Sequence, residues 1–202
     1  MDCQFKSRKQ EYGTLYADCN GDASTGSNVL HLRISLKMTQ LEYVPQRPGC
    51  KDCEIASLAT VTGVSYEEIA GVLGIAIDPT TKLPDLSKYP AGIDLLDVVY
   101  PLFRLGWSAA VVVTQEGFRK AQIGRSGPSS QQLKADLAGR RATIGYVDTD
   151  PAVGDHSLAW DGSSAIDCST GERRSLNNVE IHNAVILTRL ASPIRTGASW
   201  KG

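Results

Sequence analysis

The order of helix-like and strand-like patterns along the chain limits its possible folds more than any other feature. Between residues 53 and 74, apolar side chains recur every three or four positions, as on the buried side of a helix. From residue 107 onward, most of the apolar runs are short and bounded by turn residues, a pattern typical of paired strands. This order predicts an α+β domain, in which N-terminal helices pack on a C-terminal antiparallel β-sheet.

Individual boundaries follow from caps and helix breakers. Gly63 ends the first helix, and Ser65 with Glu68 forms a capping box that starts the second. Pro101 should kink or split the third helix, because proline lacks the N–H that a helix interior needs. Residues 115–129 are typical of a surface loop. The helices expected are 53–63, 65–74, 95–105 and 129–139, and the strands expected are 107–114, 142–147, 156–160, 165–167 and 179–190.

Length and charge narrow the classes of function. The chain has 202 residues, of which 42% are hydrophobic, enough for a core that needs no metal or disulfide scaffold. A net charge of −1 argues against a general nucleic-acid binder. We find no apolar signal-peptide core and no run long enough to span a bilayer, so we expect a cytoplasmic protein without a membrane partner. Five cysteines without an export signal are expected to be reduced thiols.

Composition also divides the chain. Residues 1–37 are polar and charged and predict a flexible extension, whose Cys3, Cys19 and His31 have no zinc-site spacing. We expect the domain itself to span 38–191, with a loose tail at 192–202.

One stretch has the arrangement of a reactive thiol. In QRPGCKDCEIASL, Gln46 precedes Cys53 by seven residues, and Asp52 is a suitable N-cap for a helix that Cys53 opens. Unpaired N–H groups and the positive end of the dipole at a helix start favour a thiolate. Cys53 is therefore the candidate nucleophile. The Gln46 side-chain amide and the Cys53 backbone N–H could together hold an oxyanion.

A base for this thiol occurs near the C-terminal end of the sheet. His156 opens one strand and Asp167 ends the next, so the Asp161-Gly162 turn between them can bring both side chains together. Asp155 would point to the opposite strand face, and His182 has no acidic or amide residue following at strand distance. We therefore expect His156 to be the base and Asp167 to orient it.

These residues, taken together, resemble the papain-like cysteine peptidases. The nearest resemblance is to the bacteriocin-leader (double-glycine) peptidases and their bacterial and phage relatives. It rests on QRPGCKDCEIASLATVTGVSYEEIAGVLGI and GDHSLAWDGSSAIDCSTG, and it runs from about Tyr43 to Leu190. Glu54, where the family has a small glycine, and Cys168, where proline is usual, depart from the pattern. We expect the bulky acid Glu54 to crowd or repel substrate.

The resemblance implies a role for each site residue. Cys53 would be the nucleophile, His156 the general base and acid, Asp167 its orienting partner and Gln46 the oxyanion donor. It implies a thiol-dependent hydrolase of peptide, isopeptide or related amide bonds, with a peptide or protein substrate. No cofactor and no nucleic-acid partner are expected, and the oligomeric state stays open.

Other interpretations fit parts of the sequence. An acyl or amide transferase would use the same triad, and an inactive relative would only bind a peptide. The two helices from Ile55 to Gly74 imitate a helix-turn-helix, although the acidic Glu67 and Glu68 would face the DNA. The CxxC of Cys50 and Cys53 suggests a redox pair, a reversible regulatory disulfide or, with His156 and Cys168, a zinc site.

Overall fold

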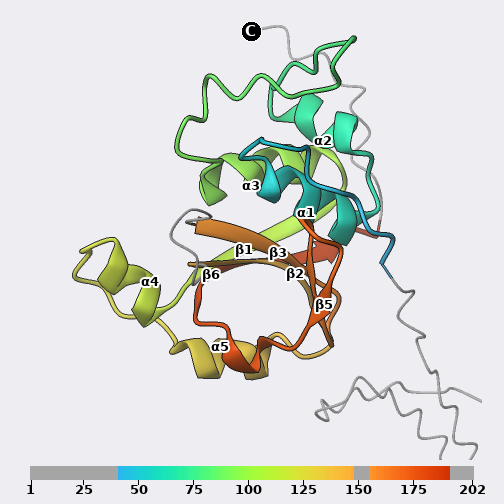
Figure 1. Cartoon of the computed structure of the whole chain (residues 1–202). Coiled ribbons are helices and arrows are strands. Elements are labelled where there is room, and N and C mark those ends of the chain that lie inside the picture. The colour runs from blue at the N-terminus through green and yellow to red at the C-terminus, as the bar shows by residue number, and fades with distance from the viewer. Residues whose placement is uncertain (1–40, 148–154, 192–202) are drawn as a thin grey trace, which may run out of the picture. The chain divides into compact units, whose positions relative to one another are not determined.

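The computed structural model describes residues 41–147 and 155–191 (Figure 1). The predicted extension 1–37, the domain start at residue 38 and the tail 192–202 lie outside these residues. Within the described ranges, no helix combines the length and the apolar character needed to cross a bilayer.

A single antiparallel sheet organises the described residues. Its six strands lie side by side in the order β1-β6-β2-β3-β4-β5. The last strand therefore lies inside the sheet, hydrogen-bonded to β1 on one side and to β2 on the other. The strands are β1 (Trp107–Val113), β2 (Arg141–Val147), β3 (Asp155–Trp160), β4 (Ala165–Asp167), β5 (Arg173–Arg174) and β6 (Ile181–Arg189).

Helices cover both faces of this sheet. Figure 1 shows α1 to α3 above the sheet and α5 below it. One buried cluster joins the first three helices to the sheet through Ile55, Leu102, Ala159 and others, and a second joins α5 to it through Leu133 and Leu137. The α+β prediction is confirmed. The helices are α1 (Cys53–Thr62), α2 (Tyr66–Val72), α3 (Leu95–Arg104), α4 (Gln115–Lys120) and α5 (Ser130–Asp136), and a 3₁₀ turn, η1, covers Leu176–Asn178.

The caps predicted around Gly63 are largely present. Gly63 adopts the left-handed conformation with φ of 71° and donates its N–H to the carbonyl of Ala59. Ser65 accepts a hydrogen bond from the N–H of Glu68, but the reciprocal bond of a capping box is absent from this described turn. The neighbouring residue Glu67, in the same turn, forms an ion pair with Arg47.

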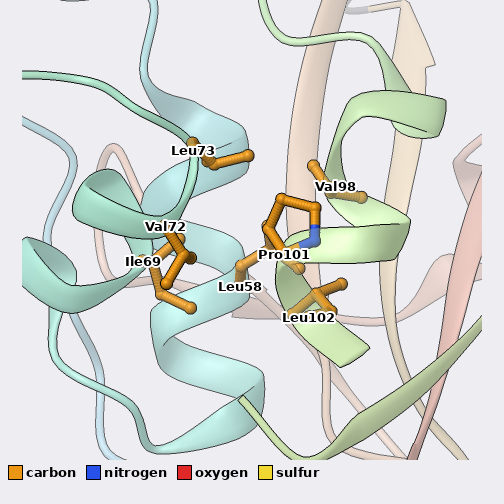
Figure 2. Close-up of a pocket in the computed structure, with 7 residues that line it drawn as sticks. All are labelled: Leu58, Ile69, Val72, Leu73, Val98, Pro101 and Leu102. Atoms are coloured by element: carbon orange, nitrogen blue, oxygen red, sulfur yellow. The ribbon is translucent and has the colours of Figure 1, made fainter. Parts of the chain in front are cut away.

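Of the two effects predicted for Pro101, a kink or a split, the split is wrong, because α3 is one continuous helix. The missing proline N–H leaves only the carbonyl four residues earlier without its usual donor. That residue, Asp97, is exposed, so water can take the place of the donor. Pro101 itself packs toward α1 and α2, in a narrow apolar seam that has no room for a water molecule (Figure 2). The seam is lined by Leu58, Ile69, Val72, Leu73, Val98, Pro101 and Leu102.

The surface loop predicted for residues 115–129 contains a short helix, α4. Thr114 caps it by accepting the N–H of Gly117, and the Thr114 hydroxyl also reaches the carbonyl of Ile181 on β6. A Cβ at Gly117 would lie 2.2 Å from the carbonyl oxygen of His182, so only glycine allows this close approach. Gly117 therefore lets α4 pack closely on β6.

The hairpin between β3 and β4 has the strand bounds that were predicted on either side of the turn. Trp160 pairs with Ala165, so the predicted Asp161-Gly162 turn lies in a four-residue connection. The Asp161 carboxylate organises it by accepting hydrogen bonds from the N–H groups of Ser163 and Ser164 and from Arg173. Burial alone would raise the pKa of Asp161, but the Ser164 N–H, the Arg173 guanidinium and Ser163 more than offset this and hold the pKa well below its usual range.

This turn gives a prediction about acid stability. A carboxyl whose folded pKa is depressed stabilises the fold above its unfolded pKa of about 4, and that contribution is lost as the pH falls further. We expect Asp161→Asn to lower the free energy of unfolding by about 2 kcal/mol at neutral pH. The difference from wild type should shrink as urea titrations move from about pH 5 to about pH 2. A gap that is constant across this range would contradict the depressed pKa.

Candidate active site

Cys53 is the first residue of α1, as predicted, and its side chain is partly exposed. The first helical hydrogen bond runs from the N–H of Ala56 to the carbonyl of Asp52, at 3.1 Å. The N–H groups of the first turn therefore have no partner within the helix. They provide the positive end of the dipole that favours negative charge at the Cys53 position.

Asp52 does not cap α1 with its side chain, contrary to the prediction. The carboxylate is fully buried, and its Oδ2 accepts the N–H of Arg47 at 3.1 Å and the hydroxyl of Tyr66. Burial, followed by this bond to Asp52, raises the pKa of Tyr66 above its usual value. Asp52 thus ties the loop before Cys53 to α2 through Oδ2, while its Oδ1 is buried without a hydrogen-bond partner among the described residues.

Gln46 lies in the same loop and is held at both ends. Its backbone N–H donates to the carbonyl of Cys168 at 2.7 Å, and its side-chain Nε2 donates to the carbonyl of Cys50 at 2.6 Å. A primary amide carries two N–H donors, so one remains after the bond to Cys50. The loop 46–52, which leads into α1, is thus held by a hydrogen bond to Cys168, the residue after β4.

His156 and Asp167 are in direct contact. Asp167 pairs with Leu158 across β3 and β4, so it shares a sheet face with His156, two residues away from Leu158. The His156 Nε2 lies 2.9 Å from the Asp167 Oδ1, and both side chains are buried. Since a carboxylate can only accept, this pairing assigns the proton to Nε2 and leaves Nδ1 as an acceptor.

Several donors surround the Asp167 carboxylate. Its Oδ1 also accepts the N–H and the hydroxyl of Ser169, at 2.9 and 2.6 Å, and its Oδ2 pairs with Arg174 on β5. The guanidinium of Arg174 also lies over the ring of Tyr146, 5.8 Å from its centroid. The Tyr146 ring in turn contacts His156 edge-on. This arrangement surrounds the Asp167 carboxylate with donors and places the imidazole between Asp167 and the Tyr146 ring.

Glu54 occupies a different place from the one expected. We predicted that it would crowd the substrate, but its carboxyl points into the sheet and is only 7% exposed. Its two oxygens accept the hydroxyls of Thr143 on β2 and Ser157 on β3, at 2.8 and 2.6 Å. Burial raises the pKa of Glu54, against the effect of these two donors.

The contacts of Glu54 relate the two halves of the predicted triad. Glu54 follows Cys53 and Ser157 follows His156, so the start of α1 lies beside the start of β3. Among the described hydrogen bonds, none joins Cys53 directly to His156 or to Gln46. The structure therefore brings His156 and Asp167 into contact and brings the helix that Cys53 opens to the same end of the sheet.

The other described cysteines differ from Cys53. Cys168 is fully buried, with its sulfur 3.6 Å from the hydroxyls of Ser57 and Thr60, and burial raises its pKa. Burial and the Asp52 carboxylate raise the pKa of Cys50, against the influence of Arg47. Cys50, Cys53 and Cys168 are all free thiols, so the reversible Cys50–Cys53 disulfide stays a prediction.

The alternative sites receive little support from the geometry. Across residues 41–147 and 155–191, no group of three or more His, Cys, Asp or Glu side chains is arranged to hold a metal ion. In the helix pair that imitates a helix-turn-helix, α1 is buried from Glu54 to Thr62. The first turn of α2 exposes Glu67 and Glu68, whose charge opposes contact with phosphates.

Sequence reasoning missed two residues of the site, Arg174 and Tyr66. The pair Arg173-Arg174 follows Asp167 across a short turn, and a charge pairing between adjacent strands could have indicated the contact with Arg174. Tyr66 gave no comparable signal, because nothing in the local pattern relates it to Asp52, fourteen residues earlier.

No family model and no curated protein matches this chain. Several solved structures are similar to it, among them a peptidase domain and a protease. One is the peptidase domain of Streptococcus ComA, a bi-functional ABC transporter involved in quorum sensing, with a TM-score of 0.45 and 16% identity over 74% of this chain and 98% of that one. The other is a double-glycine-motif protease from an AMS/PCAT transporter in complex with its leader peptide, with a TM-score of 0.46 and 16% identity over 74% of this chain and 91% of that one.

Proposed function

We propose that the chain is a thiol-dependent hydrolase of peptide or related amide bonds. The observation that supports this most strongly is the buried pair of His156 and Asp167, 2.9 Å apart, at the same end of the sheet as the start of α1. An imidazole fixed by a carboxylate next to a partly exposed thiol at a helix start is the arrangement that nucleophilic catalysis requires.

The reaction uses each residue in turn. The Nδ1 of His156 takes the proton of the Cys53 thiol, and the sulfur forms a bond to the substrate carbonyl carbon. The carbonyl π electrons move to oxygen, and the oxyanion is held by the free N–H of the Gln46 amide and the Cys53 backbone N–H. The C–N bond then breaks, and His156 gives its proton to the leaving amine.

Water completes the cycle. His156 removes a proton from a water molecule, whose oxygen adds to the thioester carbon. The C–S bond breaks, the acid product leaves, and the thiol regains its proton. Asp167 keeps Nε2 protonated throughout, so that Nδ1 is always the nitrogen that exchanges protons with sulfur, amine and water.

The oxyanion role of Gln46 gives the second prediction. Gln46→Ala removes one donor, which typically costs on the order of 3 kcal/mol in the barrier. We expect hydrolysis of an acetyl-Gly-Gly-aminomethylcoumarin probe to slow by about a hundredfold. The probe is chosen from the resemblance to double-glycine peptidases. Thermal unfolding should stay cooperative, and wild-type turnover in a folded Gln46→Ala variant would remove Gln46 from the site.

The proposal as a whole is tested by alkylation, which needs no knowledge of the substrate. Iodoacetamide rates are measured against pH, and each cysteine is mapped by mass spectrometry in wild type, His156→Ala and the matched control His182→Ala. His182 is buried and paired with Glu180 at 3.1 Å, away from Asp167.

We expect Cys53 to react fast below about pH 7 in wild type and in His182→Ala. In His156→Ala this advantage should fall at least about tenfold. Cys50 and Cys168 should react slowly, because their pKa values are raised. Equal rates for all cysteines in wild type would overturn the proposed function.

A further inference from the structure

Glu54 is a buried carboxyl that the proposed reaction does not use. It is the residue directly after Cys53. Its two carboxylate oxygens accept hydrogen bonds from the hydroxyls of Thr143 on β2 and Ser157 on β3, which are neighbouring strands. Both hydroxyls are themselves buried, at 1% and 4% exposure. A carboxyl with this environment is held in one position, because every alternative leaves buried polar groups unpaired.

The helix holds Ser157 at two points. Glu54 accepts its hydroxyl at 2.6 Å, and Ser57, one turn further along α1, donates to its carbonyl at 3.1 Å. Ser157 is the residue directly after His156. The first turn of α1 is therefore fastened to the backbone that carries the imidazole.

We infer that Glu54 is a positioning residue, whose hydrogen bonds to Ser157 and Thr143 set the distance between the Cys53 sulfur and the His156 ring. This inference rests on the proposed function. Glu54 touches neither substrate nor the reacting atoms. It acts by keeping the start of α1 in register with the start of β3, and a shift of about 1 Å between reacting groups can lower a rate by about a hundredfold.

The role is geometric, so an amide of the same shape should replace the carboxyl. In Glu54→Gln the amide oxygen can accept one hydroxyl and the NH₂ group can donate to the other. Glu54→Leu fills similar space but can make neither bond. The matched control is Thr62→Val, which removes a buried hydroxyl from the far end of α1, where it donates to the carbonyl of Leu58 at 2.7 Å.

The experiment compares iodoacetamide alkylation of Cys53 at about pH 6.5 and about pH 9 in these three variants and wild type, together with hydrolysis of acetyl-Gly-Gly-aminomethylcoumarin. At the higher pH an accessible thiol is largely ionised without help, so the ratio of the two rates reports the contact with His156. We expect Glu54→Leu to lower the ratio at least about tenfold and turnover about tenfold to a hundredfold. In Glu54→Gln the ratio and the turnover should stay within about threefold of wild type, and in Thr62→Val both should equal the wild-type values.

Each other result has a definite meaning. Three results would overturn the positioning role while the proposed function stands. They are a wild-type ratio in folded Glu54→Leu, an equal loss in Thr62→Val, and a loss in Glu54→Gln as large as in Glu54→Leu. If Cys53 is not alkylated preferentially in the wild-type protein, the proposed function itself is wrong. If Glu54→Leu fails to fold, Ser157→Ala keeps the bond to Thr143, and an unchanged ratio there is equally decisive against the inference.

Discussion

Replacing Cys53 with alanine is expected to lower hydrolysis of the Gly-Gly probe by at least about 10⁴-fold, because loss of the nucleophile removes the covalent route entirely. The fold should be retained. The side chain is partly exposed, and alanine is the best helix former, so the free energy of unfolding should change by less than about 1 kcal/mol. Initial rates and urea titrations on the same preparation check both parts.

Two other cysteines serve as matched controls for this experiment. Cys50→Ala removes a nearby thiol whose pKa is raised by burial and by Asp52. Cys168→Ala removes a buried thiol and should lower stability without abolishing turnover, because its sulfur lies in the core against the hydroxyls of Ser57 and Thr60. If Cys50→Ala were the inactive variant and Cys53→Ala stayed active, the nucleophile would be misassigned.

Asp167→Ala is expected to have the second largest effect, a loss of about a thousandfold in turnover. Without the carboxylate, the His156 ring has no partner at Nε2 and loses both its orientation and its tautomer. Arg174 also loses its ion pair. The free energy of unfolding should therefore fall by about 1 to 3 kcal/mol.

The chain contains a close structural counterpart for this substitution. Asp161 is buried, pairs with Arg173 at 2.6 Å and accepts hydrogen bonds from serines, as Asp167 does with Arg174 and Ser169. Asp161→Ala should lose a similar amount of stability and keep its turnover. Equal loss of activity in both variants would mean that Asp167 acts only through stability.

Much of the fold was predictable because local signals agreed with the tertiary structure. The helix start at Cys53 and the left-handed Gly63 are local features, and the meeting of His156 with Asp167 follows from alternation along two paired strands. These relationships need only neighbouring residues or one hairpin. The α+β order was legible for the same reason.

The errors arose where distant contacts outweigh local preference. Asp52 is a residue type that favours the cap position, but its Oδ2 accepts hydrogen bonds from Tyr66 and the Arg47 N–H, and its side chain makes no bond to the first turn of α1. Glu54 was expected to crowd the substrate because it is a bulky acid next to Cys53, yet hydroxyls from two strands make its burial possible. The two partners of Glu54 lie 89 and 103 residues away and leave no local pattern.

The place of β6 in the sheet has a consequence for how the domain folds. β6 pairs with β1 and with β2, so the last of the described strands in the sequence lies between two strands that are synthesised before it. Until Ile181–Arg189 has left the ribosome, β1 has no neighbouring strand, and the helices above it have an incomplete surface to pack on. The long chain segments between β1, β2 and β6 must close before the contacts that stabilise the sheet can form. We therefore expect folding to be slow compared with a helical bundle of equal size. A nascent chain that stops before β6 would expose the edges of β1 and β2 to pairing with other chains.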